Sequence, residues 1–375
     1  MTPTARPSGL VLGVDSGGSG IRVALAPADG GGPSLRWSSS VPAVVGPSGI
    51  DARSLLEQVL PAARELLERA PGGAADAGGG RCEAVCVGAA GMAALGDDLR
   101  AVLPAALREA LGTRRLALAS DAVTAYVGAL GQRPGVVVAA GTGMVALGTD
   151  LTPEGGWRRA DGWGHLLGDC GGGAWIGRAG LEAAMRAHDG RAGGSKALLD
   201  RLRAVFGPPE RLPGLLYPRA DRPAVLAAFA PEVAACAATD PVAAAVLREA
   251  AWHIAGAAAA ACPPSGAVPE IYDTPHISGR VISGRTGPDP GAGAPPGGVA
   301  EEAGATCEVA LVGGLFRMGD PLLVPVHEEL QKQLPHARPV EAAGEPLDGA
   351  SAVAGALVTD SLRVPTDPAM LRIIC

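Results

Sequence analysis

One stretch near the N-terminus constrains the fold more than any other. Residues 9–25 read GLVLGVDSGGSGIRVAL, in which two strand-length apolar runs flank Asp15 and a turn of glycine and serine. Glycines permit positive φ angles, so this pattern predicts a β-hairpin. Because Gly17, Gly18 and Gly20 have no Cβ, backbone N–H groups of the turn can approach an anion. An ordinary glycine-rich hairpin whose acid caps the turn explains the stretch equally well on its own.

The residues after the turn exclude two familiar phosphate-binding loops. No Gly-Lys-Ser/Thr comes after the glycines, so this is not a Walker loop. A strand rather than a helix comes next, so it is not the Rossmann fingerprint. Asp15 stands where the first strand ends, a position suited to holding a hydrated cation. A phosphate hairpin with an acid at its entry resembles the first phosphate motif of the sugar kinase, Hsp70 and actin superfamily.

Length and composition narrow the class of protein. The 375 residues exceed what one compact core usually takes, so we expect two domains. A hydrophobic content of 47% with 18% charged residues suits a soluble globular protein, and the net charge of −7 disfavours general binding to nucleic acid or anionic membranes. The seven cysteines include no CxxC pair, and no signal peptide is recognisable, so we expect the cytoplasm. The apolar run 254–262 is too short to span a bilayer.

Strands and helices alternate after an opening three-stranded meander, which predicts an α/β fold with a mixed sheet. Residues 263–306 are dense in proline and glycine and predict a surface insertion, and the residues after 359 predict a loose tail. The apolar patterns predict strands at 34–41, 84–87, 116–119, 135–140, 144–148 and 308–312, and helices at 51–68, 99–111, 122–130, 196–206, 221–238, 240–261 and 349–359, with another beginning near Ala174.

Residues 135–148 repeat the plan of the first hairpin, with Gly141, Thr142 and Gly143 as the turn between two apolar strands. Internal repetition of this kind marks architecture. We therefore predict an N-terminal domain of residues 1–131 and a C-terminal domain of residues 132–375. The glycines at 128, 131 and 135 lie at this change of domain and are expected to supply a hinge.

Glycine clusters and single acids stand at the carboxyl ends of several predicted strands. In open α/β sheets ligands bind beyond these strand ends, so the clusters can line one cleft between two domains. The stretches concerned are Asp15, 88–91, Asp121, 141–143 and Gly313-Gly314.

Taken together, these stretches are similar to the N-acetylglucosamine kinase and BadF-type ATPase family, a branch of the sugar kinase and actin superfamily. The run GWGHLLGD at 162–169 is the most specific match. The other matching stretches are 13–19, 88–91, 120–122, 141–143, 312–314 and 348–350. The resemblance implies a two-domain, actin-like (ribonuclease H-like) α/β ATPase fold with a duplicated β-hairpin core and an interdomain cleft.

The resemblance also implies ATP and Mg²⁺ as cofactors. Asp15 would organise the Mg²⁺ ion through water. The phosphates of ATP would be gripped from both domains, and Gly313 and Gly314 would approach the adenosine. The phosphate-gripping residues would be Ser16, Gly17, Gly18 and Ser19 of the first turn and Gly141, Thr142 and Gly143 of the second.

By the same resemblance, Asp121 would be the general base that takes a proton from the attacking sugar hydroxyl. From pattern alone a plain N-cap is the better explanation, since Ser120-Asp121 opens a helix, and it is the surrounding motifs that favour the general base. Trp163, Gly164 and Asp169 would contact the sugar, together with Asp121. The alternative is a core aromatic at Trp163 and an N-cap at Asp169. His165 is interpreted as a structural residue.

The chain departs from the family pattern mainly on the sugar side. Cys170 stands where the family usually has an acid, and Met144 stands where sugar kinases carry Ser. Residues 41–49 hold no Asn, the residue that N-acetylglucosamine kinases use to hold the sugar. We therefore expect a kinase for a small-molecule amino sugar, N-acetylglucosamine or glucosamine, with the acceptor hydroxyl open.

Two other functions remain as alternatives. One is a BadF-type ATPase that activates a partner enzyme through an iron–sulfur cluster. The other is a non-catalytic, sugar-binding regulator. A homodimer is open in every case, and no nucleic acid or membrane partner is expected.

Overall fold

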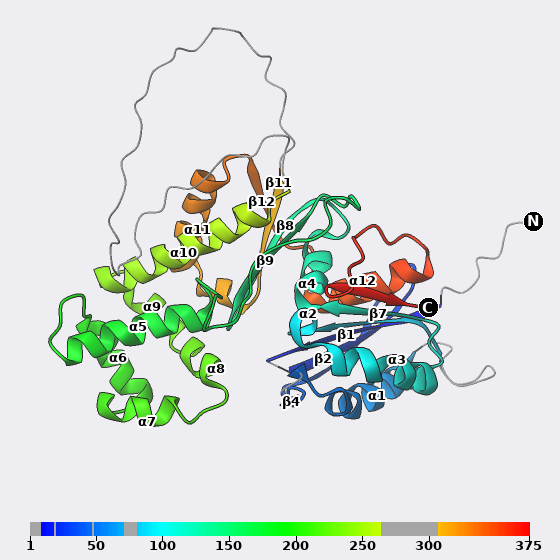
Figure 1. Cartoon of the computed structure of the whole chain (residues 1–375), viewed down its shortest axis with the longest axis horizontal. Helices are drawn as coiled ribbons and strands as arrows, with labels where there is room; N and C mark the ends of the chain where they lie inside the picture. The colour runs from blue at the N-terminus through cyan, green and yellow to red at the C-terminus, as the bar shows by residue number, and fades with distance from the viewer. Residues whose placement is uncertain (1–8, 19, 47–48, 71–80, 264–306) are drawn as a thin grey trace, which may run out of the picture.

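The computed structural model describes residues 9–18, 20–46, 49–70, 81–263 and 307–375. Two β-sheets, each with its own helices, form two halves of the chain (Figure 1). Mixed sheets and covering helices agree with the predicted α/β actin-like architecture. The predicted insertion at 263–306 lies outside the described residues apart from Pro263.

The first sheet has the strand order β13-β7-β6-β1-β2-β3. Its hairpin pairs β1 with β2 in antiparallel register, and β6 and β7 extend it in parallel. The strands are β1 (Leu10–Gly17), β2 (Gly20–Pro27), β3 (Leu35–Ser39), β6 (Cys82–Ala89), β7 (Arg115–Ser120) and β13 (Leu371–Ile374). The hairpin predicted for residues 9–25 is confirmed.

The second sheet repeats this plan, with the order β10-β9-β8-β11-β12. The hairpin of β8 and β9 is antiparallel, and β11 joins β8 in parallel. The strands are β8 (Gly135–Ala140), β9 (Met144–Thr149), β10 (Arg158–Asp161), β11 (Cys307–Val312) and β12 (Ala337–Val340). A short third sheet pairs β4 (Val45–Gly46) with β5 (Gly49–Ile50). The duplicated hairpin is therefore present in both halves.

Side chains that alternate along the strands pack into different apolar clusters on the two faces of each sheet. On β1, Leu12 and Val14 face a cluster that includes α1 (Ala52–Arg69) and α3 (Asp97–Leu111), while Val11 faces the opposite way. That opposite cluster contains α4 (Asp121–Leu130) and α12 (Pro346–Val358), and it also takes in Val137 of β8. One apolar cluster thus joins both sheets through α4 and α12.

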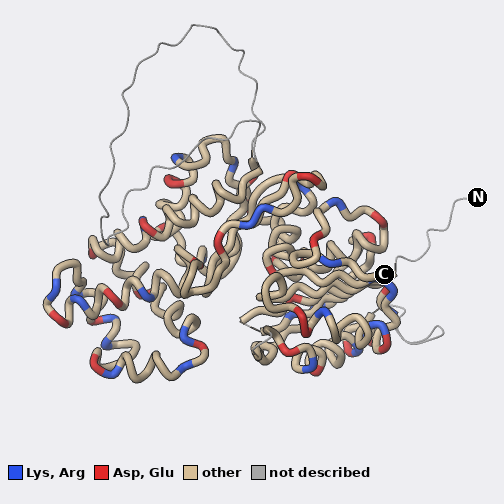
Figure 2. Tube along the Cα trace, viewed as in Figure 1, with Lys and Arg blue, Asp and Glu red and all other residues tan. Residues whose placement is uncertain are grey.

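A third cluster covers the far face of the second sheet. Its main helices are α5 (Gly173–His188), α6 (Lys196–Phe206), α9 (Ala230–Cys236), α10 (Pro241–Ala261) and α11 (Asp320–Gln333), with the shorter α7 (Leu212–Leu216) and α8 (Arg222–Ala227) at its edge. The short helix α2 (Met92–Leu95) belongs to the first half, where Met92 packs in the cluster of α1 and α3. Figure 2 shows acidic and basic residues interspersed along both halves.

Two predictions of secondary structure were wrong. The helix expected at 221–238 is two helices, α8 and α9, because Pro231 near the start of α9 cannot continue a helix from the preceding turn. The loose tail expected after 359 contains β13, which pairs antiparallel with β7. The C-terminus therefore lies beside the first sheet (Figure 1). The division at 131/132 separates the two hairpins but does not account for this return of α12 and β13.

Gly128 does not fit the hinge expected of it. It lies inside α4, where an added Cβ would overlap the carbonyl oxygen of Glu345. On the facing helix, an added Cβ at Gly349 would overlap the carbonyl oxygen of Thr124. These two glycines therefore allow α4 and α12 to pack closely. Gly131, with φ +64°, lies in the connection that comes after α4.

Candidate active site

A cleft of about 1280 Å³ lies between the two halves. Elements far apart in the sequence line it, including both hairpin turns and both glycines after β11. The predicted site residues among its walls are Asp15, Gly17, Gly18, Asp121, Gly141, Thr142, Gly143, Asp169, Gly313 and Gly314. Most of the site residues predicted at separate strand ends therefore line one cavity.

The first hairpin offers its backbone to this cleft. Gly17 and Gly18 line the cavity, and a Cβ added to either would meet no atom within 4 Å. Ser16 is fully buried beneath them, and its Oγ has no hydrogen-bond partner among the described residues. Ser19 lies outside the described residues.

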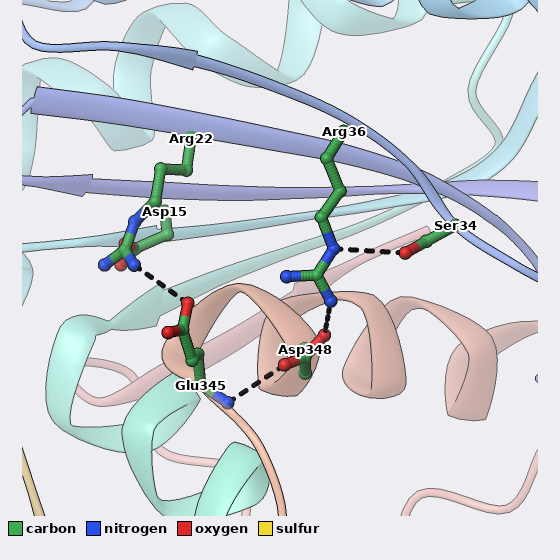
Figure 3. A network of polar contacts seen from close by, with 6 residues as sticks. All are labelled: Asp15, Arg22, Ser34, Arg36, Glu345 and Asp348. Atoms are coloured by element: carbon green, nitrogen blue, oxygen red, sulfur yellow. Dashed lines mark hydrogen bonds and ion pairs between the residues drawn. The ribbon is translucent and has the colours of Figure 1, made fainter.

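Asp15 is 5% exposed and forms an ion pair with Arg22 of the neighbouring strand (Figure 3). Burial raises the pKa of Asp15, and the guanidinium of Arg22 counteracts part of that rise. Glu345 extends the pair, since its Oε2 accepts from Arg22 Nη1 at 3.2 Å. Arg22 and Glu345 were not among the predicted site residues, although the antiparallel register of the predicted hairpin places Arg22 directly across from Asp15.

Asp121 opens α4 and lines the cleft, yet it is not the N-cap. Ser120 has the extended backbone of an N-cap, and its side chain accepts from the backbone N–H of Val123. The Oδ1 of Asp121 accepts from the N–H of Ala122 at 2.9 Å. Burial raises the pKa of Asp121 from 3.8 to about 6, and nearby Asp15 acts in the same direction. A carboxyl group that titrates near neutral pH suits a general base.

The second hairpin turn is held against the start of α5. The carbonyl oxygens of Gly141 and Thr142 each accept from a backbone N–H of α5, at Gly173 and Ala174, both at 2.8 Å. An added Cβ at Gly143 would overlap the carboxylate of Asp169. The turn and Asp169 are therefore packed as one unit.

Asp161 organises the loop that carries the predicted sugar contacts, and sequence reasoning missed it. Its carboxylate accepts from the backbone N–H groups of Gly162 at 2.7 Å, Asp169 at 2.6 Å and Cys170 at 3.0 Å. Asp169 in turn accepts from the N–H of Gly164 at 3.1 Å. Its place just before the glycine-rich run 162–169 was the only sequence signal.

Trp163 and Gly164 lie on this loop but are not among the residues that line the cleft. Trp163 is 65% exposed, and the guanidinium carbon of Arg159 lies 4.6 Å from the centroid of its ring. Trp163 is therefore not a core aromatic. Asp169 is not an N-cap either, because α5 begins at Gly173 with Gly172 as its cap.

Gly313 and Gly314 come directly after β11 and also line the cleft. Gly313 has φ +109°, and a Cβ there would overlap the carbonyl oxygen of Ala140. Gly314 begins a short 3₁₀ helix, Gly314–Met318, and has open space where a Cβ would stand. Arg317 and Met318 of this helix also line the cleft.

Asp15 is the carboxylate available for a metal ion at the first turn. In the part of the chain that the structure describes, no group of three or more His, Cys, Asp and Glu side chains could hold a metal. Mg²⁺ often uses one or two carboxylates and completes its shell with substrate phosphates and water, and the carboxylate of Asp15 lines the cleft at the first turn. The residues present therefore fit Mg²⁺ bound together with a nucleotide.

A profile of the BadF/BadG/BcrA/BcrD ATPase family matches residues 12–276, well over half of the chain. The chain belongs to this family. The matched range includes both hairpins, Asp121 and the loop organised by Asp161. The family resemblance seen in the sequence is thus confirmed.

Individual relatives agree with the family. The chain is 30% identical over 190 residues to the N-acetylmuramic acid/N-acetylglucosamine kinase of Clostridium acetobutylicum, covering 51% of this chain and 57% of that protein. A solved structure from Chromobacterium violaceum, provisionally identified as N-acetylglucosamine kinase, matches with a TM-score of 0.65 and 26% identity over 93% of this chain and 100% of its own. A similarly described structure from Porphyromonas gingivalis shares the fold, with a TM-score of 0.57 and 15% identity over 92% and 98% of the two chains.

Among the described residues, no single helix is long and apolar enough to cross a membrane. The segments Arg222–Cys236 and Pro241–Ala261, bent at 119° to each other, reach that length and apolar composition only when they are counted together.

Proposed function

We propose that this protein transfers the γ-phosphoryl group of ATP to a hydroxyl group of an amino sugar, with Asp121 as the general base. The observation that carries the proposal is the position of Asp121. It lies in the wall of the cleft that both hairpin turns line, and Ser120 takes the capping role that would otherwise explain it.

The two turns supply the phosphate site in this proposal. Gly17 and Gly18 present backbone from the first half, and Gly141 to Gly143 present backbone from the second. The N–H of Gly141 donates to the carbonyl oxygen of Gly143, so it is not offered to a phosphate. The other backbone N–H groups of the two turns would stabilise the charge on the transferring phosphoryl oxygens. Mg²⁺, held through Asp15, would neutralise part of the phosphate charge when bound.

Asp121 then needs only to accept the proton of the attacking hydroxyl. Its pKa of about 6 leaves it ionised at neutral pH while keeping it a better proton acceptor than an ordinary aspartate. Placing the base and both phosphate turns around one cavity brings the hydroxyl and the γ-phosphate together, and this positioning lowers the barrier.

The proposed binding of the sugar is supported by residues of the loop that Asp161 organises and by serines of β3. Asp169 and Gly162 from the second half line the cleft, and so do Ser38, Ser39 and Ser40 at the end of β3 in the first half. Carboxylate and hydroxyl groups are suited to hydrogen-bonding sugar hydroxyls. We propose N-acetylglucosamine, N-acetylmuramic acid or glucosamine as acceptors, because the named relatives support amino sugars. Trp163 and Gly164 remain proposed sugar contacts, because they lie on the same loop as Asp169, whose carboxylate accepts from the N–H of Gly164.

The test is ADP release from ATP and Mg²⁺ with a panel of amino sugars and plain hexoses. The proposal expects ADP release only when an amino sugar is present. Release at the same rate without any sugar would favour an ATPase that serves a partner enzyme. Sugar binding without ADP release would favour a regulator.

A further inference from the structure

The side chain of Arg22, near the turn of the first hairpin, forms ion pairs with two carboxylates, those of Asp15 and Glu345. Asp15 on β1 stands directly across from Arg22 on β2. Arg22 Nε and Nη2 both contact the same oxygen of Asp15, Oδ2, at 2.9 and 2.6 Å. The third nitrogen, Nη1, contacts Glu345 Oε2 at 3.2 Å (Figure 3).

Glu345 is itself fixed. It is the N-cap of α12 and forms a capping box with Asp348, whose Oδ2 accepts from the N–H of Glu345 at 2.9 Å. The other carboxylate oxygen of Asp348 pairs with Arg36 of β3 (Figure 3). Two arginines therefore join the first sheet to the same end of α12, but only Arg22 contacts Asp15.

This arrangement divides the two oxygens of Asp15 between different tasks. Oδ2 is occupied by Arg22, and Oδ1 has no hydrogen-bond or ion-pair partner within the described ranges. Asp15 lines the cleft, so Oδ1 is the oxygen left for a cation or its water shell. A carboxylate restricted in this way cannot offer both oxygens to one metal ion.

We propose that Arg22 is a positioning residue, held by Glu345, that restricts Asp15 to a single metal-facing oxygen and so favours Mg²⁺ over Ca²⁺. Mg²⁺ demands near-octahedral geometry and binds through single oxygens with several waters, whereas Ca²⁺ readily takes both oxygens of a carboxylate. The inference rests on the proposed function, because the metal concerned is the one that would accompany ATP.

Arg22→Lys tests this assignment, because lysine keeps the positive charge but cannot span Asp15 and Glu345 with a planar fork. Calorimetric titration with ADP in Mg²⁺ and, separately, in Ca²⁺ gives the ratio of the two affinities. Loss of a residue that orients a metal ligand typically costs about 10–100-fold in metal affinity. We expect a loss of that size for Mg²⁺ and a smaller one for Ca²⁺, so the preference for Mg²⁺ falls.

Arg36→Lys is the matched control, since Arg36 pairs with the same capping box without touching Asp15. It should leave the Mg²⁺ to Ca²⁺ ratio unchanged. Glu345→Gln, which keeps the Asp15–Arg22 pair, should shift the ratio in the same direction as Arg22→Lys by less, and it decides the matter if Arg22→Lys does not fold. An unchanged ratio in the folded Arg22 variant, or an equal shift in the Arg36 variant, would overturn the assignment.

These measurements are separable from the proposed function. A protein that shows the predicted metal shift but transfers no phosphoryl group would retain the role of Arg22 and lose the kinase. A protein that phosphorylates an amino sugar but keeps its metal ratio in Arg22→Lys would retain the kinase and lose the role of Arg22.

Discussion

Replacing Asp121 with Asn should lower turnover but raise the free energy of unfolding at neutral pH. In the wild type, burial raises the pKa of Asp121 from 3.8 to about 6. The folded protein therefore binds more protons than the unfolded chain between these values, and stability falls as pH rises through them. Each tenfold change in proton affinity is worth 1.36 kcal/mol, so the ionised carboxylate costs about 3 kcal/mol above pH 6, an upper limit because Asp121 is only partly buried.

Asn cannot ionise, and it can still accept the hydrogen bond from the N–H of Ala122. We therefore expect Asp121→Asn to be more stable than the wild type by about 1–3 kcal/mol at pH 7.5, with the difference vanishing below about pH 4. Turnover should fall about 10²–10⁴-fold, as is typical when a general base is removed.

Urea unfolding at pH 4, 6 and 7.5 measures the free energy of unfolding, and a coupled ADP assay measures turnover. Asp51→Asn is the control, because Asp51 is an exposed N-cap of α1 that accepts from the N–H of Ser54 at 2.7 Å. It should change neither quantity by much, since Asn is as good a cap as Asp. A variant at 121 that turns over like the wild type, or that is less stable at every pH, would rule out a general base with a raised pKa at this position.

The same geometry gives three further predictions. The kcat/KM of the wild type should fall tenfold per pH unit below about pH 6, as Asp121 becomes protonated; a flat profile down to pH 5 would contradict a base with this pKa. Gly143→Ala should raise the KM for the sugar while circular dichroism stays native, because its Cβ would displace Asp169, and an unchanged KM would separate Asp169 from the sugar. Gly349→Ala should lower the free energy of unfolding in urea by about 1–3 kcal/mol, because its Cβ would force α12 away from Thr124; wild-type stability would show that the helices can move apart freely.

The features that the sequence predicts well depend on residues that lie close together in the chain. The run around Asp15 encodes its own hairpin through apolar alternation and glycine, and the repeat at 135–148 encodes the second in the same way. Ser120-Asp121 is also a local signal, but sequence cannot say which of the two caps the helix. The backbone of Ser120 decides it, and that frees Asp121 to face the cleft.

The features that sequence does not predict depend on distant partners. Arg22 and Glu345 are 323 positions apart, and no local sequence pattern around either residue indicates that they are in contact. β13 is four residues long and is defined by its pairing with β7 rather than by its own pattern. Gly128 resembled a hinge because glycine is flexible, whereas its actual neighbour, the backbone at Glu345, makes it a packing residue.

In the proposed mechanism, one cleft brings ATP and a sugar hydroxyl together with Asp121 as the base. The most direct measurement is ³¹P NMR of a reaction containing the protein, ATP, Mg²⁺ and N-acetylglucosamine, N-acetylmuramic acid or glucosamine. We expect a sugar phosphate resonance that grows in step with ADP, little inorganic phosphate, and loss of both products with Asp121→Asn. ADP matched by inorganic phosphate, with no sugar phosphate for any of the three sugars, would contradict the mechanism.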